Sequence, residues 1–178
     1  MKTSKAVFLN EAFFYGTIFF TVSGLEKVVG KYGEIELWLY IVFSFFLRLK
    51  IYFDDCSHFK EPEINKYFLL GTSFGILSWM CWGLSLSIIE SLTTSYIILF
   101  VAISILSIWI LIDKIKTKDG QHLRWLIFNV YYLSGIAFLL EWIPFLKINQ
   151  VVVLLLLLIA LILDWLTSKS IDQFLKSA

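Results

Sequence analysis

Cysteine, histidine and proline are scarce in this sequence, and their scarcity excludes several classes of protein. The 178 residues include two cysteines, two histidines and two prolines. Cys56 and Cys81 are too few for a disulfide framework, and no Cys/His pattern has the spacing of a zinc site. The motifs of serine hydrolases, zinc proteases and P-loop proteins are also absent. We therefore expect no enzymatic activity and no cofactor.

Charged residues are equally sparse, whereas apolar residues are in large excess. Only 16% of the residues are charged, while 59% are hydrophobic and 18% aromatic. A soluble domain is about 45–50% apolar and about 25% charged, and a chain of this size exposes too much surface to hide such an excess. The net charge of +1 provides no basic field for nucleic acid. These values predict that the partner of the chain is a lipid bilayer.

Apolar runs long enough to cross a membrane follow one another along the whole chain. A helix needs roughly 20 apolar residues to cross the hydrocarbon layer. Residues 151–163 include no polar residue, so the last run is the most apolar. The sequence predicts an all-α, polytopic transmembrane helix bundle that forms a single membrane-embedded domain, residues 1–178. Its six predicted spans are residues 7–25, 37–53, 67–89, 94–112, 123–143 and 148–166.

The lysines and arginines are unevenly distributed over the loops that separate these spans. If the N-terminus is cytoplasmic, 12 of the 15 basic residues fall on the inner side. Lys27, Lys31 and Lys147 fall on the outer side. Cytoplasmic loops of membrane proteins carry the excess of positive charge. We therefore expect a multi-pass protein of the cell membrane with both termini in the cytoplasm.

A few charged residues lie within the predicted spans, where an ionised group is costly and therefore a candidate for function. Glu11, Arg48 and Asp164 fall at similar depths near the inner side, and we expect them to form an intramembrane charge network. The alternative is that each side chain extends to the lipid headgroups. For Lys50 and Asp113 we favour this second interpretation.

The densest polar segment follows the second span. Asp54 and His58 are four residues apart and share a face if the helix continues, so Asp54, Asp55 and His58 are weak candidates for a metal site. Local pairing is the simpler interpretation, because Lys50 and Asp54 also have i,i+4 spacing. Arg48 and Asp55 lie two turns apart. We therefore predict no bound metal.

Small residues recur at four-residue spacing in the third span. Gly71 and Gly75 form a GxxxG pattern, and Gly83 and Ser87 repeat the spacing. Such residues let helix backbones approach closely in lipid. The pattern predicts a helix-packing face, used either between copies of the chain or within one chain.

The first span resembles a known family over a short segment. Residues 10–16 read Asn-Glu-Ala-Phe-Phe-Tyr-Gly, which is similar to the first helix of the bacterial six-helix relatives of the lysosomal potassium channel. That motif reads approximately Arg-x-Glu-Ala-Phe-Ser-Asp-Gly. Leu9 stands in place of its arginine, and Phe14 and Tyr15 replace its Ser-Asp pair. The resemblance implies six helices and an ion channel, but it identifies no functional residue.

These observations favour a non-catalytic membrane subunit, which acts as a sensor, anchor or scaffold. We expect it to form a homo-oligomer or to bind a cytoplasmic protein through its basic inner loops. By analogy, small membrane proteins of this kind occur in bacterial defence and envelope systems. The alternative is a homo-oligomeric ion channel or small-solute transporter, although the middle of the spans offers few polar groups.

Overall fold

The structure is a computed structural model of the 178-residue chain. It describes residues 5–31, 33–58, 66–117, 120–143 and 148–168. Within these ranges, the side chains of residues 5–10, 56–58, 66–69, 113–117 and 120–121 lie outside the description.

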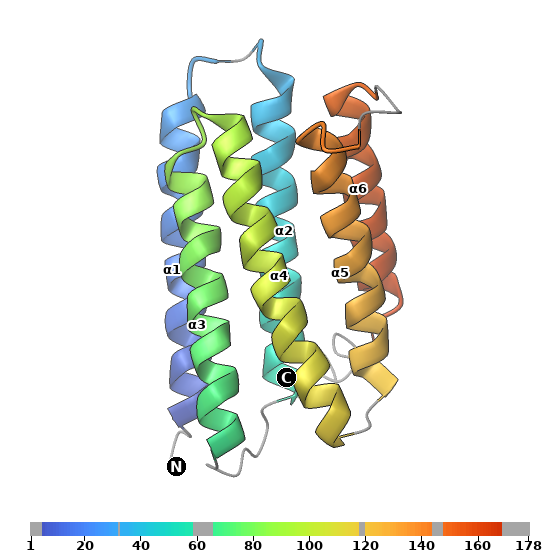
Figure 1. Ribbon diagram of the computed structural model, residues 1–178. Coiled ribbons are helices and arrows are strands. Elements are labelled where there is room, and N and C mark those ends of the chain that lie inside the picture. The colour runs from blue at the N-terminus through green and yellow to red at the C-terminus, as the bar shows by residue number, and fades with distance from the viewer. Residues whose placement is uncertain (1–4, 32, 59–65, 118–119, 144–147, 169–178) are drawn as a thin grey trace.

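The described part of the chain is helical, with short turns and no strand. Successive helices run in opposite directions, so the first residues of α1 and the last residues of α6 lie at the same end of the bundle (Figure 1). The helices are α1 (Lys5–Val28), α2 (Ile35–His58), α3 (Lys66–Ser87), α4 (Leu92–Thr117), α5 (Gly120–Leu139) and α6 (Gln150–Leu166).

Each helix coincides with one predicted span, and the differences at the ends have local causes. The chain leaves α1 through Gly30, whose φ of 94° suits a residue without a Cβ atom. α5 ends at Leu139, before the predicted end at residue 143, because Glu141 takes a left-handed conformation with φ 56°. The Asn149 side chain caps α6 by accepting a hydrogen bond of 2.8 Å from the Val151 backbone amide.

The helices form a closed ring in which each one lies beside two others. The neighbours around the ring are α1, α2, α6, α5, α4 and α3, with α3 again beside α1. Large aromatic side chains fill the interior, because helix backbones alone leave space between them. Tyr40 packs on Tyr96 with ring centroids 5.3 Å apart, and Phe43 packs on Tyr132 at 5.8 Å. The Trp82 indole donates a hydrogen bond of 3.1 Å to the Ser44 carbonyl across the interior.

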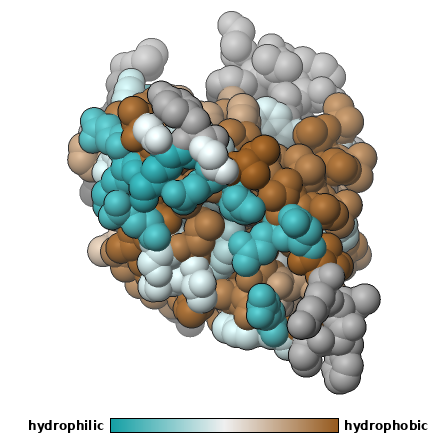
Figure 2. Space-filling model, turned by 90° about the horizontal axis from the view of Figure 1, so that it is seen from above, coloured by the Kyte–Doolittle hydropathy of each residue, from teal (hydrophilic) through white to brown (hydrophobic). Residues whose placement is uncertain are grey.

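The outer surface of the bundle is apolar along the sides of the helices. Every helix exposes large hydrophobic side chains, among them Phe19, Phe46, Met80, Ile108, Ile127 and Ile162. Figure 2 shows one end of the bundle, where hydrophilic residues gather across the end and hydrophobic residues cover the flank. By length and composition, one helix in the described part of the chain can cross a membrane, namely residues Leu92–Ile112 of α4, with a mean hydropathy of 2.6. Helix α6, Gln150–Leu166, is apolar but shorter.

A buried charge cluster that joins three helices

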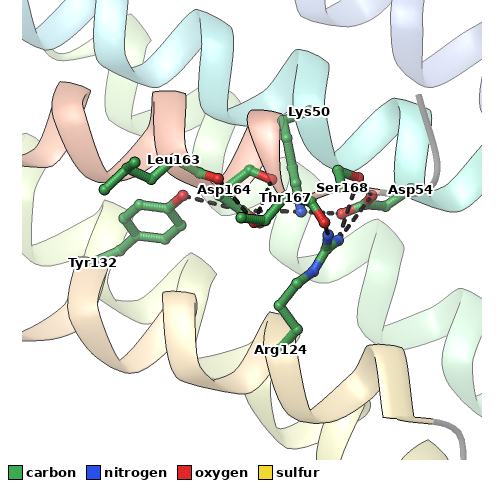
Figure 3. Close-up of polar contacts among 8 residues, drawn as sticks. All are labelled: Lys50, Asp54, Arg124, Tyr132, Leu163, Asp164, Thr167 and Ser168. Atoms are coloured by element: carbon green, nitrogen blue, oxygen red, sulfur yellow. Dashed lines mark hydrogen bonds and ion pairs between the residues drawn. The ribbon is translucent and has the colours of Figure 1, made fainter. Parts of the chain in front are cut away.

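Four charged side chains meet inside the bundle near the end at which α1 begins and α6 ends. We call Lys50, Asp54, Arg124 and Asp164 the charge cluster. α2 supplies Lys50 and Asp54, α5 supplies Arg124, and α6 supplies Asp164 (Figure 3). Lys50, Asp54 and Asp164 are each at most 6% exposed. Buried ions need partners of opposite charge, and this cluster contains two of each sign.

Asp164 connects α6 to both α2 and α5. Its Oδ2 atom lies 3.0 Å from the Lys50 ammonium and accepts a hydrogen bond of 3.1 Å from the Tyr132 hydroxyl. Its other oxygen, Oδ1, is buried and has no hydrogen-bond partner in the part of the chain that the structure describes. Asp164 is therefore the best placed member of the cluster to accept a further ligand.

Asp54 is more fully engaged than Asp164. Its Oδ2 atom pairs with the Lys50 ammonium one turn earlier on α2. Its Oδ1 atom accepts a hydrogen bond of 3.2 Å from the Ser168 hydroxyl and lies 3.9 Å from the Arg124 guanidinium. Lys50 is thus held between two carboxylates, one on its own helix and one on α6.

Arg124 closes the cluster at the end of α6. Its guanidinium donates hydrogen bonds to the Thr167 carbonyl and, over 3.2 Å, to the Ser168 hydroxyl. A cation at this position donates to carbonyl groups that a helix C-terminus leaves without partners. It also interacts favourably with the negative end of the helix dipole. The Arg124 side chain is 21% exposed, so this member of the cluster reaches toward solvent.

A small cavity with both polar and apolar walls lies beside the cluster, with a volume of about 30 Å³. Lys50, Asp54, Asp164, Tyr132, Asn129 and His122 contribute to its lining. A cavity holds a water molecule when it has about 10–15 Å³ and several polar neighbours. The volume and the lining therefore suit one or two water molecules.

Asp55 also lines this cavity, at the point where α2 leaves the predicted span. Burial raises the pKa of its carboxyl to about 7, although the Arg48 guanidinium opposes this shift. Asp55 therefore changes charge near neutral pH.

The predicted network of Glu11, Arg48 and Asp164 has a different arrangement in the structure. Asp164 pairs with Lys50, while Glu11 lies exposed on α1. Arg48 is buried 5.8 Å from the centre of the Phe13 ring and interacts electrostatically with Asp55. The expectation that Lys50 extends to the headgroups is wrong, because its side chain is 3% exposed within the ion pairs. The side chain of Asp113 lies outside the described residues.

The other predicted site was a metal site at Asp54, Asp55 and His58. Helix α2 does continue to His58, although the side chain of His58 lies outside the described residues. Among the described side chains, no group of three His, Cys, Asp or Glu residues is placed to hold a metal ion. The local pairing of Lys50 with Asp54 is present.

Three of the four small residues of α3 contact other helices of the same chain. A Cβ atom on Gly71 would overlap Trp109 of α4, and one on Gly83 would overlap Phe20 of α1. Gly75 has open space around its Cα atom. The carbonyl of Ser87 accepts a hydrogen bond from the Lys27 ammonium of α1. Two of the four residues thus provide the close approach of α3 to its neighbours within the bundle.

No family model matches the chain, and no curated protein or solved structure matches it. The resemblance of residues 10–16 to the potassium-channel relatives stays a prediction.

Proposed function

We propose that the chain is a non-catalytic membrane subunit with six spans and both termini in the cytoplasm. The observation that carries this proposal is the distribution of side chains around the ring of helices. All six helices expose large apolar side chains, whereas Lys50, Asp54 and Asp164 are buried. Soluble monomers rarely expose apolar patches of more than a few hundred Å². In a bilayer, the apolar surface contacts the hydrocarbon chains of the lipid, and the charged groups are buried inside the bundle away from them.

Within this proposal the chain acts as a sensor, anchor or scaffold. The charge cluster supports the role of a sensor, because it ties α6 to α2 and α5 by contacts that depend on ionisation. A sensor needs such a contact, whose strength changes with a stimulus. Self-assembly and the binding of a cytoplasmic partner belong to the same proposal.

Membrane integration is tested by alkaline extraction and flotation. We expect the expressed chain to stay in the membrane pellet at alkaline pH and to float with liposomes in a density gradient. A peripheral protein would be released by alkali. Recovery of the folded chain in the soluble fraction would contradict the proposal.

The second candidate is an ion channel or small-solute transporter. The observation that favours it is the cavity lined by Lys50, Asp164 and Asn129, because charged groups within a membrane that face a cavity mark transport pathways. Flux of ions through reconstituted vesicles separates the two candidates. Selective flux above that of empty vesicles would favour the transporter, while its absence in vesicles that contain the protein favours the subunit.

A further inference from the structure

The two carboxylates of the charge cluster differ in how many of their oxygen atoms have partners. Both oxygens of Asp54 have partners, namely Lys50 on one side and Ser168 with Arg124 on the other. Asp164 uses only Oδ2. Its Oδ1 atom is buried without a hydrogen-bond partner among the described residues, and Asp164 lines the cavity. Because buried polar atoms normally have partners, this oxygen requires one beyond the described residues, and the cavity has room for a water molecule that can serve as that partner.

We propose that Asp164 is a proton-binding site, supplied by water in the cavity, and that proton binding releases α6 from α2. This inference rests on the proposed role of the chain as a membrane sensor and names its stimulus. The carboxylate accepts a proton from a hydronium ion at Oδ1, which leaves one water molecule and a neutral carboxylic acid. No other bond is made or broken.

The neighbours of Asp164 allow this change without leaving Lys50 unpaired. Lys50 retains Asp54 on its own helix when the charge on Asp164 is lost. The cluster then carries one surplus positive charge. Solvent can stabilise this surplus charge at Arg124, since the Arg124 side chain is partly exposed. Proton binding thus removes the ionic tie between α2 and α6 and preserves the pairing within α2.

The charged and titratable groups around the cavity come from α2, α5 and α6, and each has a defined relation to Asp164. Lys50 and Arg124 favour its ionised form, while Asp54 opposes it. Tyr132 donates a hydrogen bond to the ionised form, and His122 is another lining residue of the cavity. The α4 residues in the lining, Leu106, Trp109 and Ile110, carry no ionisable group.

Infrared difference spectroscopy of the whole chain in lipid nanodiscs tests proton binding directly. Acidification from about pH 8 to about pH 2, which brackets the ordinary carboxyl pKa of about 4, should produce a component of the carboxylic acid C=O band that is lost in Asp164→Asn. The measurement uses an Asp55→Asn background, because the raised pKa of Asp55 would add a second band. Glu90→Gln, at an exposed residue in the turn before α4, is the matched control and should retain the band.

A second variant keeps the test informative if Asp164→Asn does not fold. Tyr132→Phe removes the hydrogen bond that stabilises the ionised carboxylate, so the midpoint of the band should move to higher pH by about one unit. The release of α6 is measured by pulsed electron resonance between spin labels at Ala12 and Thr167, both exposed. The distribution of distances between the two labels should broaden over the same pH range in which the band appears.

Several results would overturn the inference. They are an Asp55→Asn spectrum without an acid band, an acid band of unchanged intensity when Asp164→Asn is added, and a midpoint unchanged by Tyr132→Phe. If the band appears and the label separation is constant, proton binding does not release α6 and the proposal fails at that step. These outcomes are separate from the flotation test, because a chain that floats with liposomes and lacks the band refutes the proton site alone.

Discussion

Replacement of Lys50 by methionine removes the ammonium that lies between two buried carboxylates. Asp164 then retains the Tyr132 hydroxyl, and Asp54 retains Ser168 and the more distant Arg124. Removal of one partner from a buried ion pair costs about 3–5 kcal/mol, because the remaining charge stays in a medium that solvates it poorly. At roughly 2–4 °C per kcal/mol for a chain of this length, the expected fall in Tm is roughly 6–20 °C.

The assay is thermal unfolding in detergent, followed by tryptophan fluorescence. The matched control is Lys31→Met, because Lys31 forms a single ion pair of 3.7 Å with Glu90, whose side chain is 63% exposed. An exposed pair contributes about 0–1 kcal/mol, so this variant should unfold close to the wild-type temperature. Equal Tm values for Lys50→Met and Lys31→Met would refute the assignment of a buried cluster.

A double variant separates loss of the charge from loss of packing. Lys50→Met combined with Asp164→Leu replaces the pair between α2 and α6 by apolar side chains of similar volume. Such replacements are often neutral or stabilising, so the double variant should be more stable than Lys50→Met alone. If the double variant loses as much stability as the two single variants together, the two residues do not interact.

Four other predictions follow from the packing of α3 and from Asp55. Gly83→Ala should lower the free energy of unfolding by about 1–3 kcal/mol, because the new methyl group meets the ring of Phe20. Gly75→Ala should be neutral or stabilise by up to about 1 kcal/mol, since its surroundings are open; denaturant titration compares the two. Gly75→Leu should reduce an oligomer to monomer in light scattering if chains associate at this position, and unchanged mass would exclude it as a contact. Burial raises the pKa of Asp55 to about 7, so the native state holds a proton that the unfolded chain releases above about pH 4. Stability from this group is complete below about pH 4 and is lost as the pH rises through about 7, and Asp55→Asn should flatten that part of a Tm–pH profile.

The helices are readable from the sequence because their signal is local. Each apolar run is long enough for a helix, and the turns between runs contain the polar residues and glycine. The ends are less readable where a single backbone conformation decides them. At Glu141, a non-glycine residue takes a positive φ, and no composition rule indicates that choice.

The pairing of the charged groups depends on which helices are neighbours. Lys50 and Asp54 have a helical spacing that is visible in the sequence. The contact of Lys50 with Asp164 requires α2 to lie beside α6, and hydropathy does not determine the order of helices around a ring. The sequence indicates Asp164 as a candidate because it is a charged residue at the end of an apolar run. It does not indicate the partners Lys50 and Tyr132, since Lys50 is close enough to the helix end to reach the headgroups and a tyrosine in an apolar run is common.

The central claim is that the six helices span a membrane in alternating directions. The most direct measurement is the reaction of single cysteines with a membrane-impermeant maleimide, in a chain that carries Cys56→Ser and Cys81→Ser. Ser91, Glu141 and Thr167 are exposed at turns or helix ends. Ser91→Cys and Glu141→Cys should react on intact cells, whereas Thr167→Cys should react only after the cells are permeabilised. Reaction at all three positions on intact cells, or at none before permeabilisation, would contradict the six-span arrangement.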